Sequence, residues 1–167
     1  MPISQYNSDG SASFGYTSQI TVTRPANATP YTAGDVVGGA IAFLAIGPAG
    51  ASLMLNSAAL RIDVAAIPAS MTTMRLHLYS VTPPSALADN AAWDLPAGDR
   101  ASYLGFVDIG TVADLGSTLF VQVDNLNKQT KLAAGESALY GYLVTSGAFT
   151  PAGNSEVYTP TLRASAI

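Results

Sequence analysis

Cysteine is absent from this chain of 167 residues, and charged residues make up only 11% of it. Without cysteine the chain can form no disulfide, no thiol nucleophile and no thiolate metal site. Lysine and arginine number only seven and the net charge is −4, so no cluster of cations could neutralise a row of phosphates, and nucleic-acid binding is disfavoured. Average soluble domains carry about 25% charged residues. The low charge here predicts a surface of small neutral side chains, which suits a subunit packed against others or a monomer with a Ser/Thr-rich exterior.

Long uninterrupted apolar runs are also missing. The most apolar stretch, residues 36–55, is broken by several glycines and by Pro48, whereas a membrane-spanning helix needs about 20 mostly apolar residues. We expect two buried strands around a turn there, and no membrane partner. The first ten residues show neither the basic region nor the apolar region of a secretory signal.

Apolar residues at every second position are what the chain does contain. Within residues 71–81, Met and Leu alternate with Arg, His and Tyr, and this period sends one set to each face of a β-strand. Residues 52–66 also allow helical spacings, but alternation favours a strand. Pro160 cannot donate to a ladder, so it predicts a sheet edge or a bulge. Strands are expected at residues 18–24, 35–46, 52–66, 71–81, 102–109, 118–125, 137–147 and 156–167.

About eight short strands, separated by turn sequences such as Asn-Leu-Asn-Lys at 125–128, predict an all-β fold. The expected architecture is an antiparallel β-sandwich of the jelly-roll type, with residues 18–167 as a single domain. Residues 1–17 lack alternation and are rich in Ser and Gly. They predict an extended N-terminal arm, or else a disordered start. As an arm they would offer Tyr6, Phe14 and Tyr16 as anchors for a partner subunit.

Candidate catalytic groups are few. His77 is the only histidine, and a hydrolytic triad would require it as the base beside a nucleophile. Its place within a strand predicts a surface or interface histidine instead. The sequence has no nucleophile elbow, dinucleotide fingerprint or phosphate-binding loop. We therefore expect no enzymatic activity, no catalytic residue and no cofactor.

One loop concentrates the remaining polar candidates. Asp89, Asn90, Asp94 and Asp99 supply oxygen atoms that calcium prefers, but their spacing matches no EF-hand. Turn-forming Asx residues are the favoured interpretation, and no metal is expected. Trp93, the only tryptophan, lies in the same loop. It could stack on a sugar or bind a partner, or it could cap the core beneath its own loop.

One segment resembles a known group of proteins. Val-Thr-Arg-Pro-Ala at residues 22–26 is followed by Thr-x-Tyr-x-Ala-Gly-Asp-Val-Val-Gly at 29–38. This pattern resembles a segment of small structural proteins of tailed bacteriophages, most closely over residues 20–39. Residues 74–95 and 100–110 resemble later segments of the same proteins more loosely.

The resemblance implies a virion component, a head decoration or cement protein with a β-sandwich fold that binds the major capsid protein and stabilises the shell. Homo-oligomerisation would match lattice symmetry, and a cysteine-free chain suits assembly in the reducing cytoplasm of a bacterial host. The alternative is a carbohydrate-binding or adhesion module of a phage tail or fibre, using Trp93 with Asp89 and Asp94.

Overall fold

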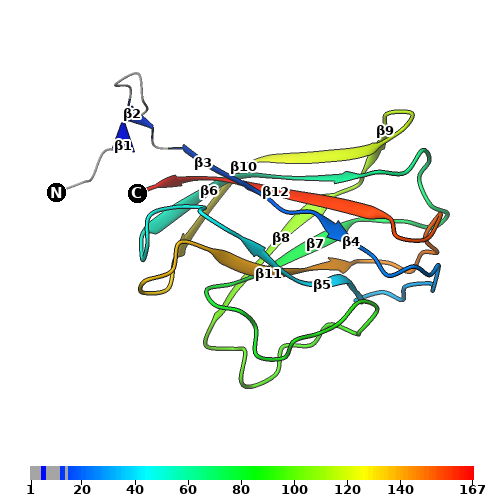
Figure 1. The fold of residues 1–167 in the computed structure, drawn as a ribbon, viewed down its shortest axis with the longest axis horizontal. Helices are drawn as coiled ribbons and strands as arrows, with labels where there is room; N and C mark the ends of the chain where they lie inside the picture. Colours follow the sequence, from blue (N-terminus) through cyan, green and yellow to red (C-terminus); the bar gives the residue numbers. More distant parts are fainter. Residues whose placement is uncertain (1–4, 7–11, 14) are drawn as a thin grey trace.

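The computed structural model describes residues 5–6, 12–13 and 15–167. Within these ranges the chain forms twelve strands, arranged mainly as two antiparallel sheets that face each other (Figure 1). The expected all-β sandwich is confirmed. That part of the chain contains no helix long and apolar enough to cross a membrane.

Each sheet has a defined strand order. The larger sheet runs β3 (Gly15–Gln19), β12 (Val157–Ala166), β6 (Ser52–Ile62), β10 (Leu119–Lys131) and β9 (Ala113–Asp114), with β4 (Val22–Thr23) also pairing with β12. The smaller sheet runs β5 (Val36–Phe43), β11 (Leu139–Thr145), β7 (Met74–Tyr79) and β8 (Tyr103–Gly110). Two short strands, β1 (Gln5–Tyr6) and β2 (Ala12–Ser13), pair only with each other.

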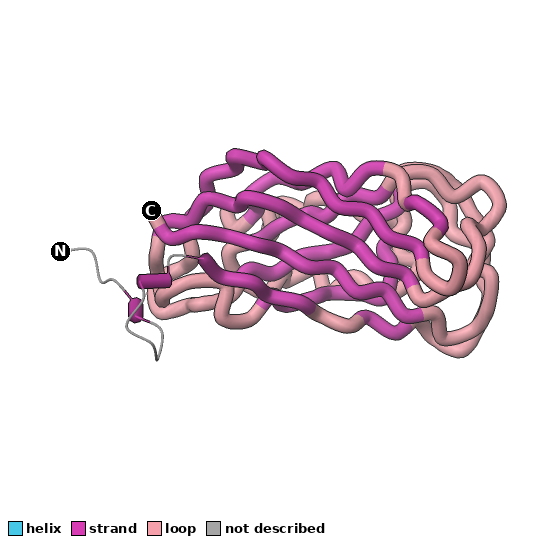
Figure 2. The backbone as a smooth tube through the Cα atoms, turned by 90° about the horizontal axis from the view of Figure 1, so that it is seen from above, coloured by secondary structure: helices cyan, strands magenta, loops and turns pink. Residues whose placement is uncertain are grey.

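This order is that of a jelly roll. If β3 and β4 count as one interrupted strand and the short strands β1, β2 and β9 are set aside, eight main strands remain. In chain order they lie first, eighth, third and sixth in one sheet, and second, seventh, fourth and fifth in the other. Two interlocked Greek keys produce this arrangement. Figure 2 shows the strands running along the long axis of the molecule, with loops gathered at its two ends.

The core follows from the alternation. Met74, Leu76 and Leu78 of β7 lie in one buried cluster together with apolar side chains of the facing sheet, while His77 and Tyr79 lie on the opposite face. The larger sheet contributes the buried faces of β6, β10 and β12. All eight expected strands are present.

Pro160 lies in an interior strand, so the predicted sheet edge is wrong. It is paired with Leu60 of β6, and the irregularity of that ladder falls between Arg163 and Ala164 instead. The carbonyl of Pro160 accepts a hydrogen bond from the N–H of Ile20, at 3.1 Å. The N–H that Pro160 lacks would have pointed to the same side. The edge strand is accordingly interrupted between β3 and β4.

The predicted turn at residues 125–128 is also wrong, because β10 continues through it. The pairing of β10 with β6 shifts between Asp124 and Lys128, which marks a β-bulge. Asn125 and Asn127 adopt φ values of 57° and 47° there. Asparagine tolerates this left-handed conformation in a bulge as well as in a turn.

The sandwich begins earlier than the sequence indicates. β3 starts at Gly15 and pairs with β12, so residues 15–17 belong to the sheet and not to an arm. Tyr16 is partly buried and packs against the main core. Phe14 and the side chain of Tyr6 lie outside the described residues.

Candidate assembly site between the free sheet edges

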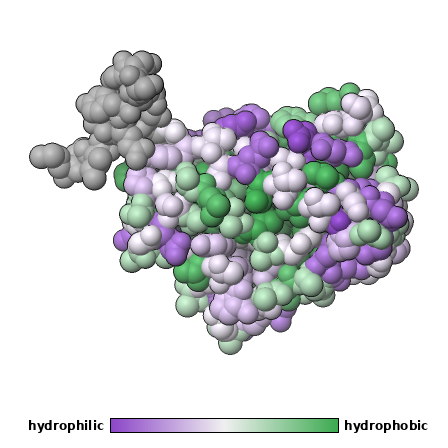
Figure 3. Space-filling model, viewed as in Figure 1, coloured by the Kyte–Doolittle hydropathy of each residue, from purple (hydrophilic) through white to green (hydrophobic). Residues whose placement is uncertain are grey.

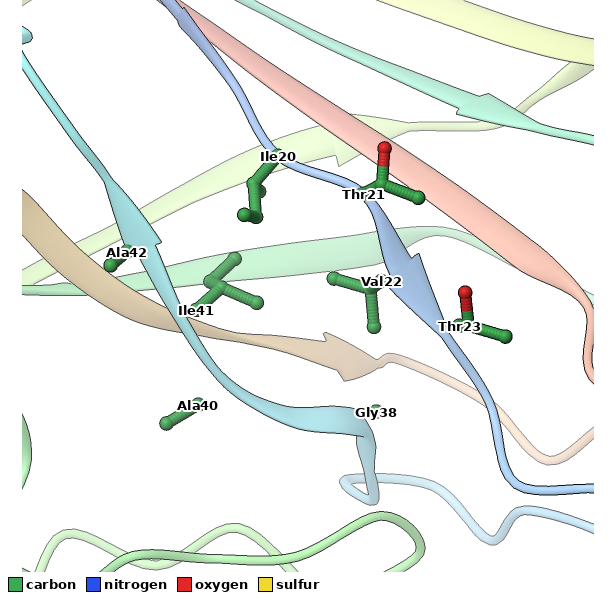
Figure 4. A pocket seen from close by; sticks show the side chains of 8 residues that line it. All are labelled: Ile20, Thr21, Val22, Thr23, Gly38, Ala40, Ile41 and Ala42. Carbon is green, nitrogen blue, oxygen red and sulfur yellow. The ribbon is translucent and has the colours of Figure 1, made fainter.

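Two sheet edges lie side by side on one face of the molecule. β5 is the edge strand of the smaller sheet, and β3 with β4 forms an edge of the larger one. Between β4 and β5 runs an open groove of about 390 Å³ (Figure 4). It is lined by Ile20, Thr21, Val22, Thr23, Gly38, Ala40, Ile41 and Ala42.

The floor of this edge groove is apolar. Ile20 and Val22 point toward β5, and Ile41 points back toward them from the opposite edge (Figure 4). Thr21 and Thr23 point away from the floor and are exposed. Figure 3 shows a band of hydrophobic surface across the middle of this face, where Figure 1 places β4 and β5. The groove therefore has an apolar base, a threonine margin on β4 and an alanine margin on β5.

Glycine allows the two edges to meet. A Cβ atom at Gly38 would lie 2.0 Å from Cγ1 of Val22, and its φ of 75° is one that other residues rarely adopt. Gly38 and Gly39 form a bulge in β5, because Tyr142 pairs with Ala40 and the next residue of β11 pairs with Val37. The bulge brings β5 against β4 and closes one end of the edge groove.

Only part of the β5 edge is open. At its first residue, the N–H of Val36 donates to the carbonyl of Ala91 at 2.9 Å, and the Val36 carbonyl accepts from Asn90 at 2.8 Å. The loop of residues 80–102 thus covers the start of β5. Residues 40–42 of the same edge lie beside the edge groove, and no charged side chain lines it. Natural sheet edges are commonly protected by charges, so this uncharged edge is suited to receive another chain.

A buried polar network holds Gly38, which lines the groove, against the 80–102 loop. The Asp89 carboxylate accepts hydrogen bonds from the N–H of Gly38 at 2.7 Å and from the Tyr31 hydroxyl at 2.6 Å. The guanidinium of Arg24, whose side chain is fully buried, donates to the Tyr31 hydroxyl and lies 3.9 Å from a carboxylate oxygen of Glu156. Burial and the hydrogen bond to Asp89 raise the pKa of Tyr31 above its usual range. The network joins the 24–31 turn, the 80–102 loop and the start of β12.

On its outer face, the smaller sheet carries an aromatic cluster beneath the 80–102 loop. The indole of Trp93 covers His77 with ring centroids 3.8 Å apart, and its Nε1 donates to the Tyr79 hydroxyl at 3.3 Å. Tyr103 lies beside both rings. Trp93 thus caps a second small core beneath its own loop, which is one of the two roles considered from the sequence.

His77 is buried, so its predicted exposure is wrong. It is 4% exposed, and its Nδ1 shares a hydrogen bond of 2.9 Å with the Tyr103 hydroxyl. Burial, with the nearby charge of Arg75, lowers the pKa of His77 to about 4. The imidazole is therefore neutral near pH 7 and packs as an aromatic ring. The sequence could not show this because the covering tryptophan lies sixteen positions later.

The acidic residues of the loop accept hydrogen bonds from other groups of the chain. Asp94 accepts from the N–H of Leu95 at 2.7 Å, and buried Asp99 accepts from the N–H of Ser85 at 3.3 Å. Asp89 and Asp99 thus join segments that lie apart in the sequence, so a turn-forming role describes only the local contact of Asp94. Across the described ranges, no group of three or more His, Cys, Asp and Glu residues could hold a metal ion.

The four residues named as partner anchors are not brought together by the described structure. Tyr16 packs on the main core and Trp93 on the aromatic cluster, while Tyr6 and Phe14 have no described side chains. The edge groove itself was missed. Its walls come from two segments assigned to different strands, and alternation within a strand gives no information on which strands become neighbours.

Comparison with solved structures returns several virus particles. The chain resembles the capsid of Ralstonia phage GP4, with 16% identity over 90% of this chain and 82% of that chain, at a TM-score of 0.39. It resembles a Macrobrachium rosenbergii nodavirus semi-empty particle with 12% identity over 92% and 91% of the chains, at 0.34. Mud Crab Dicistrovirus gives 15% identity over 90% and 68%, also at 0.34. No protein-family model and no curated protein matches the chain.

Proposed function

We propose that this chain is a structural protein of a phage virion, located on the head as a decoration or cement protein that binds the major capsid protein. The observation that supports this most directly is that the edge strands β4 and β5 lie beside each other around a groove lined by no charged side chain. Free edges and apolar grooves are surfaces on which other chains assemble. Residues 20–39, which resemble phage structural proteins, supply the whole β4 side of the groove and Gly38 of its β5 side.

Immunogold electron microscopy of purified particles, from a phage whose genome encodes this chain, tests the proposed location. Gold spread over the heads is the expected result. Gold at the tail end would favour the adhesion module instead, and particles without the protein would overturn a virion role.

A binding assay then tests the role of the N-terminal segment. Heads stripped of the protein are incubated with the full chain or with residues 15–167. The truncation starts at Gly15 because β3 starts there. Circular dichroism must first show that the shorter chain is folded. Loss of head binding is expected, whereas equal binding of both chains would refute a role for the segment in capsid attachment.

A further inference from the structure

We propose that the edge groove receives residues 1–14 of a second copy of this chain, bound as an added strand. This inference concerns contacts between copies in solution and holds whether or not the protein lies on a phage head. The first observation is geometric: β4 and the open part of β5 are edge strands, and both lie beside the groove. Strand addition at such an edge supplies main-chain hydrogen bonds, and pockets for alternate side chains supply selectivity.

The chemistry of the groove defines its occupant. An apolar floor of Ile20, Val22 and Ile41 has Thr21 and Thr23 along one margin and the alanines of β5 along the other. A bound strand would therefore place apolar side chains inward and small polar ones outward. Four residues on each wall correspond to about 13 Å of extended chain. A segment of four to six residues with little charge fits this length.

Residues 1–14 match that description in their low charge, and Met1 and Ile3 alternate with smaller residues at their start. Their sequence, MPISQYNSDGSASF, holds one charged side chain, Asp9, and spaces its large apolar residues among Ser, Asn and Gly. Within a single chain, Gln5–Tyr6 pairs with Ala12–Ser13 by a ladder of only two residue pairs. A two-stranded hairpin alone is marginally stable in water at best, so exchanging this ladder for a groove of a second copy costs little.

The point of attachment gives the segment access to a neighbour. It joins the sandwich at Gly15, the first residue of the same edge that forms one wall of the groove. Fourteen extended residues span about 46 Å, whereas Gly15 and Val22 are separated by about 23 Å of strand. When two copies place these edges together, the segment of one reaches the groove of the other.

Disulfide trapping tests the proposal cleanly because the chain has no cysteine of its own. Three variants carry one cysteine each in the segment, at Ser4, Ser8 or Ser11. A second chain, of different size through an added tag, carries Ala40→Cys at the groove. Ala40 is exposed and lines the groove. The control partner carries Ser117→Cys, exposed on the turn between β9 and β10.

Mild oxidation of the mixtures should give the mixed-size disulfide with Ala40→Cys, at least tenfold above the Ser117→Cys control for one or more segment positions. The full chain should also show a larger mass than residues 15–167 by light scattering. Equal trapping by Ala40→Cys and Ser117→Cys would overturn the proposal. So would a chain carrying both Ser4→Cys and Ala40→Cys that closes only within itself, because the segment would then occupy its own groove.

Discussion

The ring of Trp93 lies 3.8 Å from the imidazole of His77, centroid to centroid, and shields the only histidine from water. The indole belongs to the 80–102 loop and the imidazole to β7, so this contact holds the loop against the smaller sheet. The loop also covers the start of β5 and supplies Asp89 behind the edge groove. Loop attachment and groove shape are therefore linked.

Replacing Trp93 should loosen this loop. Trp93→Ala removes a half-buried ring and leaves the Tyr79 hydroxyl without its donor, so we expect a loss of about 2 kcal/mol in the free energy of unfolding. Trp93→Phe keeps a ring over His77 and should lose about half as much. Urea denaturation measures both. A Trp93→Ala chain as stable as the parent would show that the ring does not stabilise the loop. In that case, a loss of glycan binding in the same variant would indicate that Trp93 contacts the glycan directly.

Buried neutral His77 makes stability depend on pH. Its pKa is about 4 in the folded chain and about 6.5 when unfolded. Between these values the unfolded chain binds a proton that the folded chain does not, so stability falls as the pH falls through this window. From pH 7 to 5 the His77 contribution is a loss of about 2 kcal/mol.

His77→Phe isolates that contribution. The substitution keeps an aromatic ring beneath Trp93 and removes the titrating group, although it also removes the hydrogen bond to Tyr103. The urea midpoint should fall between pH 7 and pH 5 for the parent. For the variant, the midpoints at the two pH values should lie closer together. Identical pH dependence in both chains would place the imidazole in water, contrary to its burial.

Arg24 and Glu156 form a buried pair whose contributions to the free energy of unfolding should be coupled. Arg24→Met leaves the Glu156 carboxylate with hydrogen bonds from Gly153 and Tyr158 but without its cation. Breaking a buried pair on one side costs about 3–5 kcal/mol. The double change Arg24→Met with Glu156→Gln should cost less than the sum of the two single changes. A double-mutant cycle by chemical denaturation checks this, and strict additivity would contradict the coupling.

Two glycines distinguish backbone strain from a steric clash. Gly34 and Gly38 have φ values of 89° and 75°, but a Cβ at Gly34 meets nothing within 4 Å while one at Gly38 meets Val22. Gly34→Ala should cost about 1 kcal/mol from strain alone. Gly38→Ala should cost about 3 kcal/mol or more, since the clash is added. Adding Val22→Ala to Gly38→Ala should recover part of the loss, and no recovery would mean that the two edges do not touch there.

Alternation was sufficient to predict the eight strands and the jelly-roll class, because residues on the two faces of a strand such as β7 differ in polarity. It could not predict features that depend on which strands lie next to each other. Pro160 is typical of a sheet edge, yet it lies inside the sheet because its missing N–H faces the gap between β3 and β4. The asparagines of β10 permit a turn and a bulge equally well. The edge groove depends on Val22 meeting Gly38, which no local pattern encodes.

The gap opposite Pro160 also gives the edge strand two separate attachments. β3 pairs with β12 on one side of the gap, and β4 pairs with it on the other. One hydrogen bond, from the N–H of Ile20 to the carbonyl of Pro160, bridges the gap, and β4 holds two residue pairs with β12 where β3 holds five. The β4 wall of the groove therefore depends on contacts outside its short ladder, namely the packing of Val22 over Gly38 and the hydrogen bond from the N–H of Arg24 to the carbonyl of Glu156.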